Sequence, residues 1–554
     1  MNKFKIKKAV ALVKNVLFTG SILGISCSAF SADDIKPVKN IIIMIPDGMS
    51  VSGTTLTRLY NGAPLTLDPL AVGLMSTWSS DGTIADSAPA GSAISTGWKS
   101  QSGNIASTGK VYSLSSTRSS DEALRPVATI LEAARLKGKA IGVVSTSEFM
   151  HATPADFTAH DPSRKSYDNL TEQMVYNHLD VILGGGTKYL RADIRKDNED
   201  MKEILIKKGY SFVDSTEALK NFEGKRLVGV FGKTPEHTAI SNDIDRDSRL
   251  EPALEEMTDV AIKTLSKDED GFVLMIEGSK IDWSAHANDP IGMISEIAAF
   301  DKAVAKALTY AKADGNTLLI SVSDHGNSGI SIGNRDTSEN YDKTSWTEFV
   351  TPLKAALVTG EGFEEKLPAN REGGSVETMG NEVRRLAQEW LGVTDLTNQE
   401  IESILKAKKG QINYAVGPIL AKRAKIGFTT NGHTGEDTVL YSYDPRGTLL
   451  KGLVDNTDVA KFMARSIDVD LDKATETLFV DAQSAFLEKK ATIILDESDA
   501  ENPVLVVTKN NQTLRIPRNK SEVWLNDTMV ESDGVNVFNG EKWFVSSKVI
   551  SLIN

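Results

Sequence analysis

Two stretches of the chain combine carboxylates and histidines at spacings that suit metal binding. Glu277 ends an apolar run, and Asp282 and His286 follow it four residues apart. Two residues four apart share one face of a helix, so Asp282 and His286 could chelate one ion while Glu277 serves a second. The adjacent pair Asp324 and His325 follows another apolar run. Each pattern also has a structural interpretation, as an ion pair on a helix or as the cap of a turn.

Two further stretches add ligands of other kinds. His433 lies between glycines, and His151 precedes Thr153, whose hydroxyl together with a carboxylate suits a hard ion such as Mg²⁺. Arg164 follows shortly after, and a guanidinium can bind two phosphate oxygens through parallel hydrogen bonds. A lone histidine or arginine is commonly structural, and His160, His178 and His237 are interpreted in that way. Together, the four stretches predict a metal centre that binds phosphate.

Ser87 is the candidate nucleophile of this centre. It lies in the stretch 84–93, where small neighbouring side chains would let a ligand approach closely and where a helix is expected to begin. A serine near the positive end of a helix dipole is well placed to meet an anion. The preceding Asp86 leaves the alternative that the pair Asp86-Ser87 is only a helix N-cap.

Charge limits the partners of the protein. The formal net charge is −13 over 554 residues, which argues against a nucleic-acid-binding surface. The same charge would repel a phosphate substrate unless bound cations reverse the local sign. A site for small phosphate esters would therefore need bound metal ions.

The N-terminus has the composition of a signal peptide. Five lysines precede the apolar run 16–25, and small residues follow near Ser31 and Ala32. This order predicts a signal peptide over residues 1–31 and export to the periplasm or the medium. The apolar run is too short for a stable membrane span, and the only cysteine, Cys27, would be lost on cleavage.

The remaining pattern alternates between buried strands and helices. Ile41–Ile45 is a continuous apolar run that Pro46 stops, which is typical of a parallel strand buried on both faces. Asp47 comes directly after it, either as a turn residue or as a carboxylate presented to a ligand at the edge where open α/β sheets bind ligands. We expect an α/β fold with a doubly wound, mostly parallel sheet between helices. The other expected elements are strands at 140–144, 181–183, 227–231, 272–276 and 317–322, a helix from Pro126 to Gly138, and a helix from Asp289 to Gly315.

Two regions depart from this alternation. Residues 327–430 contain polar and loop-like segments with helices expected near 382–391 and 399–408, so we interpret them as an insertion that rims the site or forms a dimer surface. From about residue 490, short alternating runs separated by turn residues predict a small all-β module over 490–554, with strands at 504–508, 513–516, 522–525 and 543–545. The catalytic domain would then span residues 32–489.

In their order along the chain, these motifs resemble those of the alkaline phosphatase family. The resemblance covers roughly residues 39–455 and rests on Pro46-Asp47-Gly48, Asp86-Ser87-Ala88, Ala152-Thr153-Pro154-Ala155, Glu277 with Asp282 and His286, Asp324-His325, and His433-Thr434-Gly435. It implies a phosphomonoesterase with two Zn²⁺ and one Mg²⁺ that forms a covalent phosphoserine on Ser87.

The resemblance also implies a role for each residue. Asp282, His286 and His433 would hold one zinc; Asp47, Asp324, His325 and ionised Ser87 the other; and Asp47, Thr153 and Glu277 the magnesium. Arg164 would bind the phosphate and be steadied by Asp86. His151 and Trp283 occupy positions where some members carry Asp and Lys, and Asn327 one where some carry a further histidine. These three side chains are expected to tune magnesium retention and phosphate affinity. The insertion resembles a variable crown-like segment of the family, which leaves a homodimer possible.

Two other functions remain open from the sequence. A phosphodiesterase of the same superfamily could use a similar metal centre, although Arg164 favours the dianionic phosphate of a monoester. Alternatively, the chain could be a surface-binding protein that acts through residues 490–554.

Overall fold

The computed structural model describes residues 36–109 and 123–553. Residues from Pro37 onward form one compact unit. The expected signal peptide and Cys27 lie outside the described residues. Within the described part of the chain, no helix is both long and apolar enough to cross a membrane.

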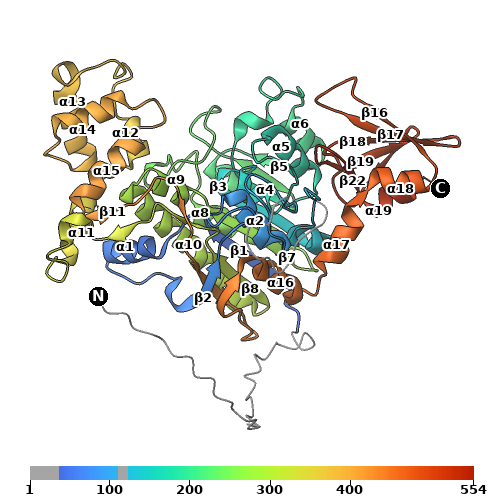
Figure 1. Ribbon diagram of the computed structural model, residues 1–554, viewed down its shortest axis with the longest axis horizontal. Coiled ribbons are helices and arrows are strands. Elements are labelled where there is room, and N and C mark those ends of the chain that lie inside the picture. The colour runs from blue at the N-terminus through green and yellow to red at the C-terminus, as the bar shows by residue number, and fades with distance from the viewer. Residues whose placement is uncertain (1–35, 110–122, 554) are drawn as a thin grey trace, which may run out of the picture. The chain divides into compact units, whose positions relative to one another are not determined.

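A large, mostly parallel sheet forms the centre of this unit (Figure 1). Only β13 runs antiparallel to its neighbours β2 and β8, so the predicted fold class is confirmed. In spatial order, the ten strands found among the described residues are β14 (Gly452–Asp455), β2 (Ala71–Ser76), β13 (Thr438–Tyr443), β8 (Thr317–Val322), β1 (Asn40–Pro46), β7 (Phe272–Gly278), β3 (Ala140–Glu148), β4 (Val181–Gly185), β6 (Leu227–Val230) and β5 (Ser211–Val213).

Strand β1 shows why the centre of the sheet is stable. Alternate side chains of a strand point to opposite faces, and here both faces are covered. Ile41, Ile43 and Ile45 enter one hydrophobic cluster, whereas Ile42 and Met44 enter another. All five are fully buried, so the continuous apolar run has the structure that the sequence predicted.

Helices cover both faces of the sheet. One face carries α2 (Ser87–Thr96), α3 (Ile130–Leu136), α4 (Ala152–Ala155), α5 (Tyr167–Tyr176), α6 (Met201–Lys207), α16 (Asn456–Ser466) and α17 (Leu471–Leu478). The other carries α7 (Thr216–Lys220), α8 (Leu254–Leu265), α9 (Lys280–His286) and α10 (Pro290–Asp314). Helix α10 has the ends expected from the sequence, because Asp289 caps its first turn and Gly315 adopts the left-handed conformation after its last.

The helix expected from Pro126 begins later. Helix α3 starts at Ile130, because Thr129 accepts a hydrogen bond from the Glu132 amide and Glu132 accepts one from the Thr129 amide. This capping box fixes the first turn four residues after the proline, which instead lies in an isolated bridge with Ser107.

The insertion is mostly helical and packs around a hydrophobic core that it shares with α1 (Val51–Asn61), α9 and α10. The two helices expected there are present as α13 and α14, whereas three others were not predicted. Internal prolines, Pro352 and Pro418, and two glycines in the shortest helix obscured their patterns. The five are α11 (Trp346–Lys354), α12 (Gly360–Glu364), α13 (Val376–Leu391), α14 (Asn398–Lys406) and α15 (Asn413–Arg423). Helix α1 contacts α11.

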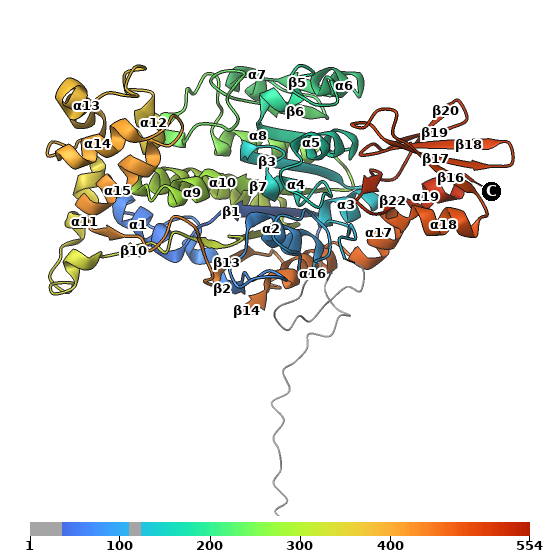
Figure 2. The same cartoon turned by 45° about the horizontal axis from the view of Figure 1, so that its top comes forward.

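The C-terminal region forms the expected β structure. Its antiparallel sheet consists of β16 (Thr492–Asp496), β17 (Val504–Lys509), β18 (Gln512–Pro517), β19 (Glu522–Leu525) and β20 (Thr528–Glu531). A second sheet joins β22 (Trp543–Val545) to β21 (Val537–Phe538) and to β15 (Val480–Asp481). The shared core includes Ala482 and Phe486 of α18 (Ala482–Glu488), which precede residue 490. Helix α19 (Ser547–Ser551) completes the region, which Figure 2 shows beside α5 and α6.

Candidate active site

The functional side chains meet at the carboxyl ends of four adjacent strands, β8, β1, β7 and β3. The parallel register pairs Ile45 of β1 with Glu277 of β7, so that Asp47 emerges just beyond Glu277. Asp324 follows β8 on the other side of β1. This is the sheet edge at which open α/β folds bind ligands.

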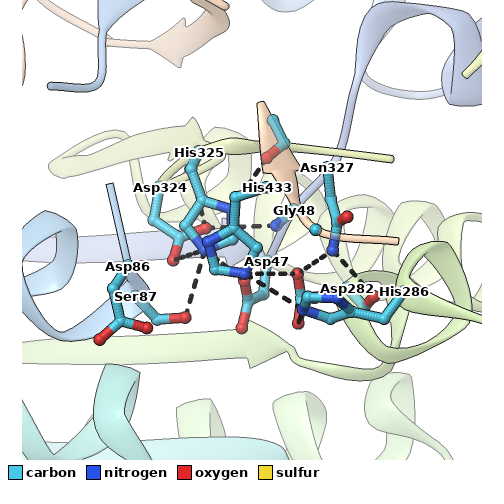
Figure 3. Close-up of polar contacts among 12 residues, drawn as sticks. Asp47, Gly48, Asp86, Ser87, Asp282, His286, Asp324, His325, Asn327 and His433 are labelled. Carbon is cyan, nitrogen blue, oxygen red and sulfur yellow. Dashed lines mark hydrogen bonds and ion pairs between the residues drawn. The ribbon is translucent and has the colours of Figure 1, made fainter. Parts of the chain in front are cut away.

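One metal-ligand group forms around His325. Ligand atoms of Asp47, Asp324 and His325 all lie within 4.8 Å of one another, and all three residues are completely buried (Figure 3). The Asp324 carboxylate also accepts a hydrogen bond of 3.2 Å from the Gly48 amide. The Ser87 hydroxyl lies 3.2 Å from His325 Nε2, so the candidate nucleophile belongs to this group.

A second group forms around Asp282, whose Oδ2 lies 3.3 Å from His286 Nε2 on the same face of α9. His433 Nε2 lies 3.6 Å from Asp282 Oδ1 and 3.1 Å from His286 Nε2 (Figure 3). Ligand atoms of Asp282, His433 and His325 also lie within 4.8 Å of one another, so the two groups adjoin. His433 reaches this position because β12 (His433–Thr434) pairs with β9 (Gly326–Asn327), and Asn327 Nδ2 donates to Asp282 Oδ1 at 2.6 Å.

A third group combines Thr153, Glu277 and Asp47. Thr153 lies on α4, which contacts β7, and Glu277 of β7 pairs with Ile45, two residues before Asp47. Among the described residues, Thr153 Oγ1, Glu277 Oε1 and Asp47 Oδ2 are buried without a hydrogen-bond partner of good geometry. Buried oxygens without partners are costly, and a hard cation would satisfy all three.

The electrostatics of the site also call for cations. Burial, followed by the charges of Asp324, Asp282 and Glu277, raises the pKa of Asp47 well above its usual value. Burial likewise raises the pKa of Glu277 to about 8, and burial together with Asp282 raises that of Asp324 to about 7. Several carboxylates therefore share a buried space in which, without bound metal, they resist ionisation.

Arg164 points into the same space as Ser87. It forms an ion pair with Asp86, and its Nη2 lies 3.1 Å from His151 Nε2. Arginine can only donate, so His151 accepts with Nε2. Burial and the charge of Arg164 lower the pKa of His151 to about 3, which keeps the imidazole neutral. Asp86 thus orients Arg164, while its own side chain makes no capping hydrogen bond to α2.

A cavity of about 650 Å³ opens over these residues. Ser87, Arg164 and Trp283 line it, and the insertion contributes Glu361 and Tyr414. The insertion therefore rims the site, which was one of the two alternatives from the sequence. The Trp283 ring lies edge-on to His151, with centroids 5.8 Å apart.

Sequence reasoning missed the residues that connect the insertion to α9. Lys280 is almost fully buried, and its ammonium lies 2.6 and 2.8 Å from the two carboxylate oxygens of Glu361. It also lies 5.2 Å from the centroid of the Trp283 ring. A lysine inside the buried segment between Glu277 and Asp282 was a detectable signal, whereas nothing in the sequence identified its partner.

The histidines interpreted as structural lie outside the metal groups. His160 is buried, with its ring nitrogens 2.9 Å from Glu132 Oε1 and from the Ala106 carbonyl oxygen. His178 forms an ion pair with Glu531, and His237 lines a different cavity.

Comparison with known proteins agrees with this geometry. Residues 38–469 match the sequence model of the alkaline phosphatase family. The chain belongs to the alkaline phosphatase family. Alkaline phosphatase 3 of Bacillus subtilis is 35% identical over 492 residues, which are 85% of this chain and 99% of that protein. The repressible alkaline phosphatase of Saccharomyces cerevisiae is 29% identical over 525 residues, covering 85% of this chain and 90% of the yeast protein.

Solved alkaline phosphatases share the fold. The Thermus thermophilus enzyme has a TM-score of 0.68 at 26% identity and covers 78% of this chain and 92% of its own. The cold-active enzyme from a psychrophilic Shewanella has a TM-score of 0.64 at 28% identity and covers 77% of this chain and 99% of its own. This alkaline phosphatase is therefore an enzyme that acts on phosphate esters, with groups of metal-binding residues at its centre.

Proposed function

We propose that this alkaline phosphatase hydrolyses phosphate monoesters through a covalent phosphoserine on Ser87. The observation that carries the proposal is the position of the Ser87 hydroxyl, 3.2 Å from His325 Nε2 and in one cavity with Arg164. A nucleophile, a metal-ligand group and a guanidinium thus face the same space. That combination suits displacement at phosphorus.

The residues present fit two zinc ions and one magnesium ion. Asp282, His286 and His433 would hold one zinc, and Asp47, Asp324 and His325 the other, because zinc accepts mixed imidazole and carboxylate ligands. Asp47, Thr153 and Glu277 offer only oxygen, which suits magnesium. When bound, the ions neutralise the buried carboxylates and the substrate phosphate and favour loss of the Ser87 proton.

The chain's own residues then carry out two displacements. In the first, Ser87 Oγ gives up its proton to water and forms a bond to phosphorus, the bond to the alcohol oxygen breaks, and that oxygen takes up a proton from water. In the second, a water oxygen bonds to phosphorus, and the bond to Ser87 Oγ breaks, which releases inorganic phosphate and restores the hydroxyl. Arg164 donates two N–H groups to non-bridging oxygens and is held in place by Asp86.

Arg164 also favours monoesters over the alternative of phosphodiesters. A diester has one fewer non-bridging oxygen and a lower charge, so it gains less from the guanidinium. We expect wild type to hydrolyse p-nitrophenyl phosphate much faster than bis(p-nitrophenyl) phosphate. Arg164→Ala should lower the monoester rate more than the diester rate. A faster diester reaction in wild type would make the enzyme a diesterase, and equal losses for both esters would show that Arg164 does not set the preference.

We further propose that residues 1–31 are a signal peptide and that the mature enzyme acts in the periplasm or outside the cell. The order of basic, apolar and small residues supports this. N-terminal sequencing of the exported enzyme should begin near Ala32, and a retained N-terminus would contradict it.

A further inference from the structure

Asn519 connects the C-terminal β module to the catalytic domain through hydrogen bonds of its side chain. It lies in the turn between β18 and β19, has a left-handed backbone with φ of 65°, and is 2% exposed. Its amide nitrogen donates to Asn169 Oδ1 at 3.2 Å and to Glu172 Oε2 at 2.9 Å. Its oxygen accepts from Gln173 Nε2 at 3.0 Å. These three side-chain partners all belong to α5.

The neighbours of Asn519 reinforce this contact. Lys520 Nζ lies 3.2 Å from Glu172 and 2.6 Å from Glu199, and Ser521 Oγ donates to the Tyr176 carbonyl oxygen at 2.9 Å. The contact between the module and α5 is therefore a buried network of hydrogen bonds and ion pairs, in which Glu172 Oε1 is held by the Lys520 ammonium alone. Such networks specify one arrangement of the elements that they join.

From α5 the network continues to the phosphate-binding arginine. Asn169 Nδ2 donates to Asp161 Oδ2 at 2.9 Å, and Asp161 Oδ1 accepts from the Ser163 amide at 2.8 Å. Asp161 is itself 6% exposed and is held by the backbone bridge to Ile105. Thus Asn169 fixes the carboxylate that shapes the turn immediately before Arg164.

We propose that Asn519 is a positioning residue for Arg164, and that the β module braces the phosphate site through α5. The inference rests on the proposed role of Arg164 in binding phosphate. It gives residues 490–554 a function in the proposed reaction that does not require a separate binding partner.

A glycine substitution tests the side-chain amide of Asn519 without disturbing the backbone conformation of the turn. Glycine adopts positive φ without strain, so Asn519→Gly removes the hydrogen bonds and keeps the turn accessible. Asn526→Gly is the matched control. Asn526 also has positive φ, of 56°, in the same module, and its one side-chain hydrogen bond is to the Thr513 amide in an exposed turn.

We expect Asn519→Gly to raise both KM for p-nitrophenyl phosphate and the inhibition constant of inorganic phosphate. Side chains along such a path change ligand coupling by about 0.5–2 kcal/mol, which is about two- to thirtyfold. The value of kcat at saturating substrate should change much less than KM. Hydrogen exchange of the peptide 161–170 should accelerate in Asn519→Gly and stay unchanged in Asn526→Gly.

Asn169→Ala breaks the same path inside the catalytic domain and should give the same rise in KM, including if Asn519→Gly does not fold. In an Arg164→Ala background, Asn519→Gly should have no further effect on phosphate inhibition, because mutations on one path are not additive. A lowered melting temperature with unchanged KM and inhibition constant would overturn the inference. So would a full effect that persists without Arg164.

The outcomes separate this inference from the proposed function. If Arg164→Ala leaves phosphate inhibition unchanged, the role of Arg164 is wrong and the inference falls with it. If Arg164→Ala weakens inhibition while Asn519→Gly and Asn169→Ala do not, only the inference about the module is overturned.

Discussion

Metal removal should make the stability of this enzyme depend on pH in a direction opposite to that of ordinary ion-paired carboxylates. Glu277 is completely buried, and without metal its pKa is raised from 4.5 to about 8 by burial and then by Asp324. A carboxyl group with a raised pKa holds a proton in the folded protein that the unfolded chain has already released. The contribution of Glu277 to stability is therefore most favourable below pH 4.5 and falls as the pH rises toward 8.

The size of this loss of stability follows from the difference between the pKa of Glu277 in the unfolded chain, 4.5, and in the folded protein, about 8. Each pH unit across it costs about 1.4 kcal/mol, so Glu277 alone accounts for about 5 kcal/mol between pH 4.5 and 8. Asp47 and Asp324 share the same space and titrate together with Glu277, so we count one group only. A bound cation removes this loss, because it stabilises the ionised carboxylates.

The assay is urea unfolding at several pH values between 5 and 8, followed by tryptophan fluorescence. Three samples are compared: metal-loaded wild type, wild type dialysed against chelator, and chelator-dialysed Glu277→Gln, whose side chain is neutral throughout. Buried carboxyls elsewhere, such as Glu296, are common to all samples and cancel. We expect dialysed wild type to lose stability with pH more steeply than the variant. Parallel curves for these two samples would refute the reasoning.

Three substitutions test other contacts of the site. Trp283→Lys places an ammonium beside the phosphate cavity and should tighten inhibition by phosphate; an unchanged inhibition constant would show that this position does not tune affinity. Asn327→Ala removes the 2.6 Å hydrogen bond to Asp282, so half-inactivation should need about 10–100-fold less chelator while kcat in excess metal is largely kept; equal chelator resistance would contradict this. Glu361→Gln leaves the buried ammonium of Lys280 without its anion and should lower the free energy of unfolding by about 1–3 kcal/mol, less than for a fully buried pair because Glu361 is partly exposed. The same urea midpoint in wild type and variant would disprove this.

The parts of the site that are local in sequence could be predicted. The four-residue spacing of Asp282 and His286 placed both on one face of a helix, and their side chains lie 3.3 Å apart on α9. The buried strands were recognised because a continuous apolar run is needed where both faces of a sheet are covered. Since parallel strands end at one edge, the ligands after β1, β7 and β8 were expected to meet there, as they do.

Contacts between distant segments could not be predicted. Asn327 and Asp282 are 45 residues apart, Lys280 and Glu361 are 81 apart, and nothing local marks them as partners. Residues with two possible roles were equally undecided. Asn519 has the type and position of an ordinary turn residue, and only the packing of the module against α5 reveals what its amide contacts.

The most direct test of the account is whether phosphate becomes attached to Ser87. The metal-loaded enzyme is mixed with p-nitrophenyl phosphate, quenched in acid and digested, and the peptide containing residue 87 is weighed by mass spectrometry. We expect one added phosphoryl group on Ser87 in wild type, together with loss of both the adduct and the metal-dependent activity in Ser87→Ala. Robust hydrolysis by Ser87→Ala, or turnover by wild type with the phosphoryl group on a different residue, would contradict the central claim.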